Sequence, residues 1–376
     1  MAIAAQNAAE RDDPQDWLQL IRSRRVGAVT FHRLLGEHGS ARVALKALPE
    51  VARAAGVEQY SICPIEVVQA EMRSGRAFGA RLLLWGGPDY PAAMMDLPDA
   101  PPILWARGEV ALLQRPMVAM VGARNASSLG LRMARRLAEG LGQGGQVVVS
   151  GLARGIDTAA HEAALESGTV AVMAGGVDVT YPEENTELAR QIAEKGCLLS
   201  EQPMGCVPQT RHFPLRNRLI SGLSRAVVVV EAAARSGSLI TARDAADQGR
   251  EVMAVPGHPF DARAAGCNML LRDGATLVRH AGDVAEALGL AAPQVTEAPT
   301  PEAAALPGPE TPRRPLGDIA QLHSQILARL GPSPLAEDQL IRDLALPPSV
   351  LTPALVSLEL EGRITRAAGG LLSRAD

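Results

Sequence analysis

The sequence predicts an α/β protein organised around a doubly wound, mostly parallel β-sheet. Between residues 117 and 278, short apolar runs alternate with amphipathic helical patterns, which is the order that builds a parallel sheet with crossover helices. The apolar runs are continuous, so the strands are expected to be buried on both faces. At 376 residues the chain is long enough for two or three domains, and a proline-rich stretch lies on each side of this region.

The large domain is expected over residues 76–287 and begins with an extended connector. Its prolines exclude a helix or a central strand, and short strands are predicted at 82–85 and 103–106. The main strands are predicted at 117–121, 146–149, 169–173, 197–200, 226–230, 252–255 and 276–278. The helices between them are predicted at 128–142, 157–167, 184–194, 216–222 and 238–248. Such a Rossmann-like domain binds its ligands at the carboxyl ends of the strands.

Two smaller domains flank this sheet. Residues 14–75 read as short helices at 16–22, 29–38 and 41–48 with glycine turns between them, which is similar to the SAM-like and helix-hairpin-helix group, although a plain helical bundle has the same pattern. Residues 288–317 are rich in Pro, Ala, Thr and Glu and predict a disordered linker.

Residues 318–376 give three helical patterns, at 319–330, 336–344 and 349–361, and a closing hairpin, which is the order of a winged helix. Its third helix carries glutamates and no arginine. This charge favours a protein contact over DNA readout, although the predicted wing carries Arg363 and Arg366.

Composition limits the classes of function. The net charge of −4 gives no global signal for nucleic acid, so any such site must be a local patch. Lys46 and Lys195 are the only lysines, and this use of arginine suits phosphate recognition but also fits a compositional bias. The four cysteines have no C-x-x-C spacing and predict reduced thiols. Without a signal-like start or an apolar run of about 20 residues, the protein is expected in the cytoplasm, with no membrane partner.

Familiar catalytic and cofactor motifs are absent from the sequence. The first glycine turn has Arg124 where a dinucleotide fingerprint needs glycine, the second strand ends without an acid, and no phosphate loop of the G-x-x-x-x-G-K type exists. Asp157 and His161 lie one helical turn apart, but a structural role is favoured over an acid–base pair. Glu231 is the best lone candidate for a general base, and His258 has no partner at metal-ligand spacing. No cofactor, metal or catalytic residue is therefore predicted.

Phosphate binding is what the remaining residues favour. Three turns, beginning at 121, 150 and 213, join an apolar run or loop to a helix through small residues and arginine. Free N–H groups at helix starts and the helix dipole attract anions. The segment 207–225 holds four arginines and no acid, and the segment from Ser236 adds a fourth helix start rich in hydroxyl groups. Phe213 is either a stacking platform for an open base or a packing residue.

Several of these segments resemble one family. They are V-G-A-R at 121–124, S-G-L-A-R-G-I-D at 150–157, F-P-L-R-N-R-L-I-S-G-L-S at 213–224 and S-G-S-L-I-T-A at 236–242, with P-G near 256 and the connector Y-P-A-A-M-M-D-L-P. Together they resemble the DNA-processing protein A family (DprA or Smf) over almost the whole chain. The resemblance implies a homodimer, not an enzyme, that binds single-stranded DNA without sequence preference and loads RecA recombinase onto incoming DNA in natural transformation.

The resemblance also implies the nucleic-acid-binding residues. Family members often carry lysine just before F-P, where this chain has Thr210-Arg211-His212, and Arg211 is the candidate substitute. The expected set is Gly122, Arg124, Ser150, Gly151, Arg154, Gly155, Arg211, Phe213, Arg216, Asn217, Arg218, Ser221, Gly222, Ser236, Gly237, Ser238 and Thr241. Replacing Arg124 or Arg218 with alanine is expected to weaken binding of all sequences alike.

A second hypothesis is an enzyme that acts on a small nucleotide monophosphate. The sheet and its turns also resemble the phosphoribohydrolases of the lysine-decarboxylase-like group. That group carries P-G-G-x-G-T-x-x-E after a late strand, where this chain reads E-A-A-A-R-S-G-S-L-I-T-A without the inner glutamate. Release of free base that depends on Glu231 would support the enzyme hypothesis.

Overall fold

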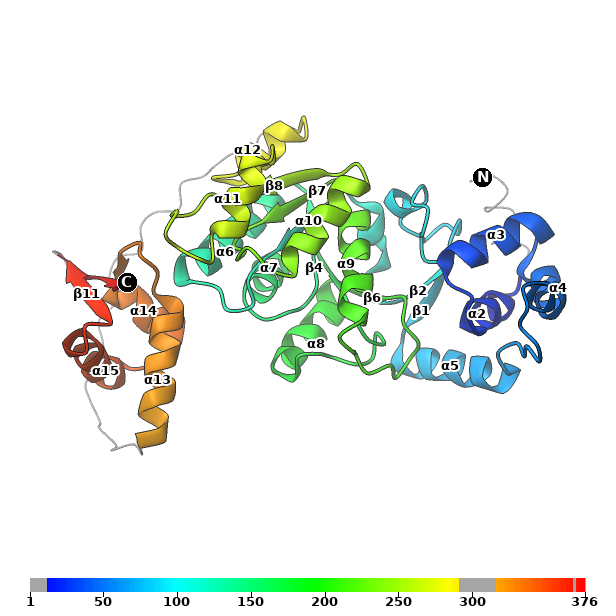
Figure 1. The fold of residues 1–376 in the computed structure, drawn as a ribbon, viewed down its shortest axis with the longest axis horizontal. Coiled ribbons are helices and arrows are strands. Elements are labelled where there is room, and N and C mark those ends of the chain that lie inside the picture. Colours follow the sequence, from blue (N-terminus) through cyan, green and yellow to red (C-terminus); the bar gives the residue numbers. More distant parts are fainter. Residues whose placement is uncertain (1–11, 291–315, 368–369, 376) are drawn as a thin grey trace.

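The structure, a computed structural model, describes residues 12–290, 316–367 and 370–375. Three regions follow one another along the molecule (Figure 1): a helical domain at the N-terminal end, a large sheet domain in the centre, and a small helical and β-hairpin domain at the C-terminal end. No helix within the described ranges is both long enough and apolar enough to cross a membrane.

The described part of the central domain contains a nine-stranded sheet in the order β1-β2-β6-β5-β4-β3-β7-β8-β9. From β3 to β9 neighbouring strands are parallel, whereas β1 and β2 form an antiparallel edge. The chain runs from β3 outward to β6 and then returns to place β7 on the other side of β3, where Val118 pairs with both Val148 and Ala226. The bounds are β1 (Arg81–Leu84), β2 (Ile103–Gly108), β3 (Met117–Val121), β4 (Val147–Ser150), β5 (Thr169–Val172), β6 (Cys197–Ser200), β7 (Ala226–Val229), β8 (Glu251–Ala254) and β9 (Thr276–Leu277).

Helices cover both faces of this sheet because successive strand residues point to opposite sides. Val118 and Met120 of β3 pack in one core cluster, and Met117 and Val121 pack in another. The first face is covered by α6 (Ser128–Gln143), α7 (Ile156–Ala164) and α12 (Ala281–Ala287). The second face is covered by α8 (Thr186–Lys195), α9 (His212–Leu223), α10 (Ser238–Asp247) and α11 (Ala265–Arg272). Short 3-10 turns lie at η1 (Ala92–Met94), η2 (Val110–Gln114) and η3 (Glu183–Asn185).

The N-terminal helical domain shares its core with the second face of the sheet. It contains α2 (Pro14–Arg22), α3 (Ala28–His38), α4 (Ala41–Ala54) and α5 (Ile65–Phe78). Its buried Glu71 pairs with Arg22 at 2.8 Å and accepts a hydrogen bond from Nε1 of Trp105 in β2, also at 2.8 Å. This carboxylate therefore fixes the helical domain against the antiparallel edge of the sheet.

The C-terminal domain is a winged helix. It contains α13 (Leu316–Arg329), β10 (Leu335–Ala336), α14 (Glu337–Leu344), α15 (Pro348–Leu360), β11 (Ile364–Ala367) and β12 (Leu371–Arg374). Arg366 on the wing pairs with Glu337 at 2.7 Å and Glu359 at 3.3 Å. Arg363 lies 3.6 Å from Glu361. Both wing arginines therefore have carboxylate partners. Like the glutamates of the third helix, this pairing disfavours contact with the phosphates of a DNA groove.

The predicted fold class is confirmed, including the mostly parallel sheet and both flanking domains. Three helices, α5, α11 and α12, were not predicted from the sequence. The helix predicted at 41–48 continues as α4 to Ala54. Pro49 lies inside α4, where a helix would ordinarily be interrupted. Most of the linker expected at 288–317 lies outside the described residues.

Candidate nucleic-acid interface

A cavity of about 700 Å³ lies at the carboxyl edge of the sheet, where ligands of such sheets bind. We call it the rim pocket. Its walls come from the turn after β3, the loops after β4 and β5, and the start of α9. It brings together six of the seventeen residues expected from the sequence: Arg124, Gly151, Arg154, Gly155, Phe213 and Arg216.

Glycine is required in the loop between β4 and α7, which forms one wall of the rim pocket. Gly155 has φ +76°, and a Cβ there would collide with the carbonyl oxygens of Ala123 and Arg124. A Cβ on Gly151 would overlap the guanidinium of Arg216. The two glycines thus let the first and second turns, and the arginine of α9, approach one another closely.

Arg216 is the buried cation of the rim pocket. Its residue is only 6% exposed, its Nη1 donates to the carbonyl oxygen of Val172 at 3.2 Å, and its Nε has no hydrogen-bond partner among the described residues. Burial, opposed by the charge of Asp157 and reinforced by that of Arg124, lowers the pKa of Arg216 to about 10. Because no carboxylate lies within hydrogen-bonding or ion-pair distance of it in the described structure, Arg216 remains a buried charge that an anion would stabilise.

Aromatic rings and a second arginine form the outer wall. The Arg124 guanidinium lies 5.4 Å from the centroid of the Phe213 ring, within the range of a cation–π contact. The Phe213 ring lies 5.7 Å from the ring of Tyr181 at 55°, and Tyr181 is 52% exposed. The predicted platform at Phe213 is therefore paired with an exposed tyrosine, which the sequence analysis missed. Tyr181 could have been found from the sequence, because it is one of only three tyrosines in the chain and follows a predicted buried strand, where ligands of such sheets bind.

Arg154 lies at the mouth of the rim pocket and pairs with Glu184. Both side chains are at least half exposed, so the pair contributes little free energy and is readily exchanged for another anion. Arg135, also missed, contributes from α6 and lies 3.9 Å from Glu162.

The structure corrects the expectation that backbone amides of the second turn are free for phosphate. Asp157 accepts from the amides of Gly151 and Ala153 at 3.1 and 3.3 Å, and Nε2 of His161 accepts from the amide of Leu152 at 3.3 Å. These acceptors belong to the protein itself, so the amides of Gly151, Leu152 and Ala153 are already paired. These contacts are what a structural role of Asp157 and His161, favoured over an acid–base pair, would produce.

The hydrogen bonds around His161 define its protonation. Its Nε2 accepts, so Nδ1 carries the proton and donates to Thr169 Oγ1 at 2.7 Å, which in turn donates to the carbonyl oxygen of Val148 at 2.9 Å. Burial, together with the Arg216 charge, lowers the pKa of His161 to about 3. His161 is therefore neutral at physiological pH, and both of its ring nitrogens are engaged by groups of the protein.

The first turn is also occupied by a side chain of the protein. Glu231, directly after Val230, accepts from the amide of Ser127 at 3.0 Å and from its hydroxyl at 2.6 Å. The same hydroxyl accepts from Gly130 N at 3.0 Å and so caps α6. Burial raises the pKa of Glu231, but both carboxylate oxygens are engaged, which makes Glu231 a capping residue of the fold.

Arg218 does not lie free at the rim, contrary to expectation. Its guanidinium pairs with Glu201, donates to the carbonyl oxygen of Asp99 at 2.9 Å and lies 3.4 Å from the Asp99 carboxylate. Its side chain is 15% exposed. Arg218 therefore joins α9 to the connector and to the loop after β6.

Five further expected residues are engaged in contacts within the protein. Ser150 Oγ donates to Met120 O at 2.6 Å, and Ser221 Oγ donates to Arg218 O at 3.1 Å. A Cβ on Gly122 would meet Ile156, one on Gly222 would meet Leu97, and Thr241 is 1% exposed. These residues shape the strand ends and helix contacts that position the rim pocket.

The last five expected residues lie outside the rim pocket. Arg211 is exposed beside His212, and Asn217 Nδ2 donates to Gly237 O at 3.5 Å. The hydroxyls of Ser236 and Ser238 bond to each other at 2.7 Å at the start of α10. A role in DNA binding for Arg211, Asn217, Ser236, Gly237 and Ser238 stays a prediction.

Three family models match successive parts of the chain. A DprA-like N-terminal HHH domain matches residues 11–74, DNA recombination-mediator protein A matches residues 81–289, and a DprA winged helix domain matches residues 296–370. The chain belongs to the DNA recombination-mediator protein A family.

Known members of this family share sequence and fold with the chain. DNA processing protein DprA of Streptococcus pneumoniae is 46% identical over 197 residues, which cover 52% of this chain and 70% of that protein. Protein Smf of Synechocystis is 35% identical over 308 residues, which cover 75% and 77%. The X-ray structure of DNA processing protein A from Streptococcus pneumoniae matches with a TM-score of 0.57 at 32% identity, over 76% of this chain and 96% of that one.

A second solved member was determined for its single-stranded DNA binding mode. It is DNA processing protein A from Helicobacter pylori, which matches with a TM-score of 0.52 at 31% identity over 56% of this chain and 95% of that chain.

The winged helix contributes to the rim pocket of this family member, which the sequence did not indicate. Gln325 and Arg329 of α13 and Asp343 of α14 line the cavity. Arg329 Nη1 donates to the carbonyl oxygen of Ala126 at 3.0 Å. From the sheet domain, Arg263 donates to the carbonyl oxygens of Ala328 at 2.7 Å and Leu330 at 2.9 Å. These carbonyls lie at the end of α13, where helix carbonyls lack partners of their own.

Proposed function

We propose that this protein binds single-stranded DNA without sequence preference in the rim pocket. One observation carries the proposal: among the described residues Arg216 is buried without a carboxylate partner, in the cavity that Arg124, Phe213 and Tyr181 also line. A phosphate oxygen would compensate the buried charge, and the aromatic pair would receive a base.

The chemistry of the pocket favours a single strand over a duplex. Stacking on an aromatic ring needs a base whose face is open, and every base has such a face. Hydrogen bonds and charges on the sugar–phosphate backbone carry no sequence information. A pocket made of arginines and aromatic rings therefore supports binding that is selective for strandedness and tolerant of sequence.

Membership of the family supports the same proposal. The Helicobacter pylori relative is described by its single-stranded DNA binding mode, and the described residues of this chain bring arginines and aromatic rings to one cavity at the carboxyl edge of the sheet. The relative's DNA binding and the residues of this cavity together support DNA binding by this chain.

We further propose that the protein acts as a homodimer that loads RecA recombinase onto incoming single strands during natural transformation. This step rests on the family resemblance of the whole chain. A test is the lag before RecA forms filaments on a single strand coated with single-strand-binding protein. The protein should shorten this lag, and a variant that cannot bind DNA should not.

No observation favours the nucleotide-hydrolysing enzyme. Its one candidate base, Glu231, has both carboxylate oxygens engaged by Ser127. We propose no catalytic role for the rim pocket.

The direct experiment compares poly-dT with a duplex of equal length in a gel shift across a salt series. We expect tighter binding of the single strand and a linear fall of log affinity with log salt concentration. Equal affinity for both forms, or no binding at low salt, would contradict the proposal.

A further inference from the structure

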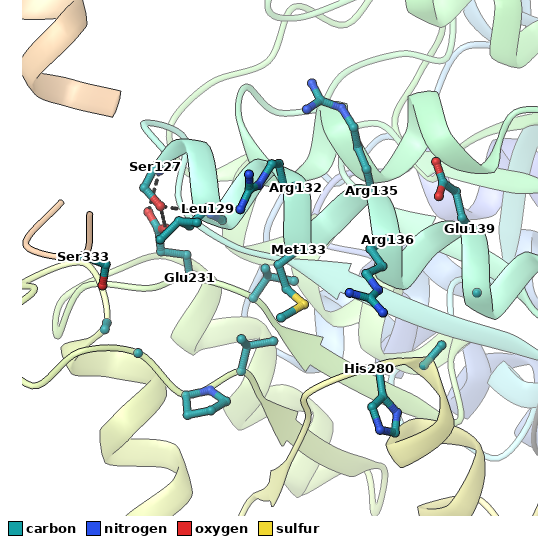
Figure 2. A pocket seen from close by; sticks show the side chains of 18 of the residues that line it. Ser127, Leu129, Arg132, Met133, Arg135, Arg136, Glu139, Glu231, His280 and Ser333 are labelled. Atoms are coloured by element: carbon teal, nitrogen blue, oxygen red, sulfur yellow. Dashed lines mark hydrogen bonds between the residues drawn. The ribbon is translucent and has the colours of Figure 1, made fainter. Parts of the chain in front are cut away.

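A second cavity lies beside the rim pocket on the other side of α6. It measures about 1310 Å³ and is bounded by α6, the start of α12 and the loops that follow β7 and β8. We call it the α6 groove. Figure 2 shows Arg136 pointing toward His280, Arg135 pointing away from it, and Arg132 between them, pointing toward Leu129.

The groove and the rim pocket are joined by one residue. Arg135 lines both cavities, so a flexible chain that leaves the rim pocket over α6 would meet Arg135 before it reaches Arg132 and Arg136. Arg132 and Arg136 are exposed and make no ion pair with any described residue. They lie four residues apart, on one face of the helix.

The acidic residues of the α6 groove are mostly engaged elsewhere. Glu231 is held by Ser127, and Asp261 pairs with Arg263 at 3.1 Å. Glu139 is the remaining acid and is exposed on α6. The two arginines therefore dominate the open face of the groove.

An exposed aromatic residue stands at the edge of the groove. Phe260 is 84% exposed in a chain that is only 3% aromatic, and its neighbours His258 and Asp261 line the groove. The loop that carries it is braced. Asn268 bonds both the amide and the carbonyl of Gly257 at 3.2 and 3.1 Å, and Asp261 N donates to His258 O at 2.9 Å. Phe260 is thus presented to solvent by an ordered turn.

We propose that a second stretch of the same single strand binds along the α6 groove, with phosphates at Arg132 and Arg136 and a base stacked on Phe260. This inference rests on the proposed function of the rim pocket and extends it. A positively charged track with an aromatic platform is the arrangement that holds single strands without sequence preference. Binding of long strands would then use both cavities, and binding of short strands would use the rim pocket alone.

The test compares dT oligonucleotides of about 4 to about 24 nucleotides, a range that brackets typical single-strand sites. The variant Arg132→Ala/Arg136→Ala should bind the shortest bound oligonucleotide like the unaltered protein and the longest about tenfold more weakly. Its salt slope for the longest strand should fall by about 1.4, since each phosphate contact on a single strand contributes about 0.7. The matched control is Arg73→Ala/Arg76→Ala, which removes two exposed arginines from α5 in the N-terminal domain.

Phe260→Trp supplies a direct readout of stacking. The chain's own tryptophans, Trp17, Trp85 and Trp105, are all at most 9% exposed, so the new indole would dominate the DNA-sensitive fluorescence. We expect quenching by long oligonucleotides and little by short ones. Unchanged affinity of the arginine variant at every length, together with no quenching, would overturn the proposal that DNA binds in the α6 groove. Absence of binding by the unaltered protein would instead overturn the proposal that single-stranded DNA binds in the rim pocket.

Discussion

Gly151 lies directly against the guanidinium of Arg216, so closely that a Cβ at position 151 would overlap Nη1. The contact joins the turn after β4 to the first half of α9, across 65 residues of sequence. It explains why a glycine is needed at the end of β4 although its own backbone φ is not positive.

Replacing Gly151 with alanine is expected to displace Arg216 and weaken single-strand binding while the fold is retained. The overpacking should lower the free energy of unfolding by about 1–3 kcal/mol, measured by urea denaturation. Gly36→Ala is the matched control, because a Cβ there meets nothing within 4 Å and alanine favours a helix. Gly151→Ala with normal affinity would show that the position of Arg216 is irrelevant to binding.

Replacing Arg218 with alanine should act on stability. It would leave Glu201, whose pKa burial raises, without its cation, and breaking such a buried pair costs about 3–5 kcal/mol. Arg218→Ala should therefore lower the melting temperature markedly and bind DNA normally at temperatures where it is folded. A stable variant with weakened binding would restore the original expectation of a DNA contact.

His161 makes stability depend on pH. Its pKa is about 3 in the folded protein and near 6.5 in an unfolded chain, so between these values only the unfolded state takes up a proton. The free energy of unfolding should thus fall as pH decreases below about 6.5, by up to about 1.4 kcal/mol per unit from this residue.

The measurement is denaturant unfolding of the protein and of His161→Gln between about pH 7 and about pH 4. The variant should be less stable at neutral pH but show a shallower fall. Parallel curves for the two proteins would mean that His161 is not buried in its neutral form.

The sequence predicted much of this fold because its strands are continuous apolar runs and its helices are amphipathic. Both patterns are local, and the parallel order follows from their alternation. The side-chain partners were not predictable in the same way. Arg216 and Arg218 stand two residues apart in one acid-free segment, yet one lies in the rim pocket and the other pairs with Glu201.

The expectation of free amides at the helix starts was wrong because side-chain partners could not be predicted from the sequence. Glycine and serine at the turns were expected to leave free amides. Asp157 and His161, a few residues further along the chain, accept from amides of the second turn, and Glu231 accepts from the amide of Ser127 across the fold. Glu231 is 104 residues from Ser127 along the chain. Sequence spacing carries no information about such a contact, nor about the approach of the winged helix to the rim.

The winged helix should separate from the rim when the two arginines that anchor it are replaced. Arg263→Ala deletes the hydrogen bonds to Ala328 and Leu330, and Arg329→Ala deletes the one to Ala126. The double variant should therefore show a larger radius of gyration by small-angle X-ray scattering. Identical scattering from the two proteins would show that other contacts hold the winged helix in place.

The most direct test of the rim pocket is the salt dependence of dT binding by Arg124→Ala, with Arg73→Ala on α5 as control. Arg124 lines the rim pocket and also contacts its aromatic wall, so its loss should weaken binding of every sequence alike and reduce the salt slope by about 0.7. The control should match the unaltered protein. An Arg124→Ala variant with the same affinity and the same slope as the control would contradict single-strand binding in the rim pocket.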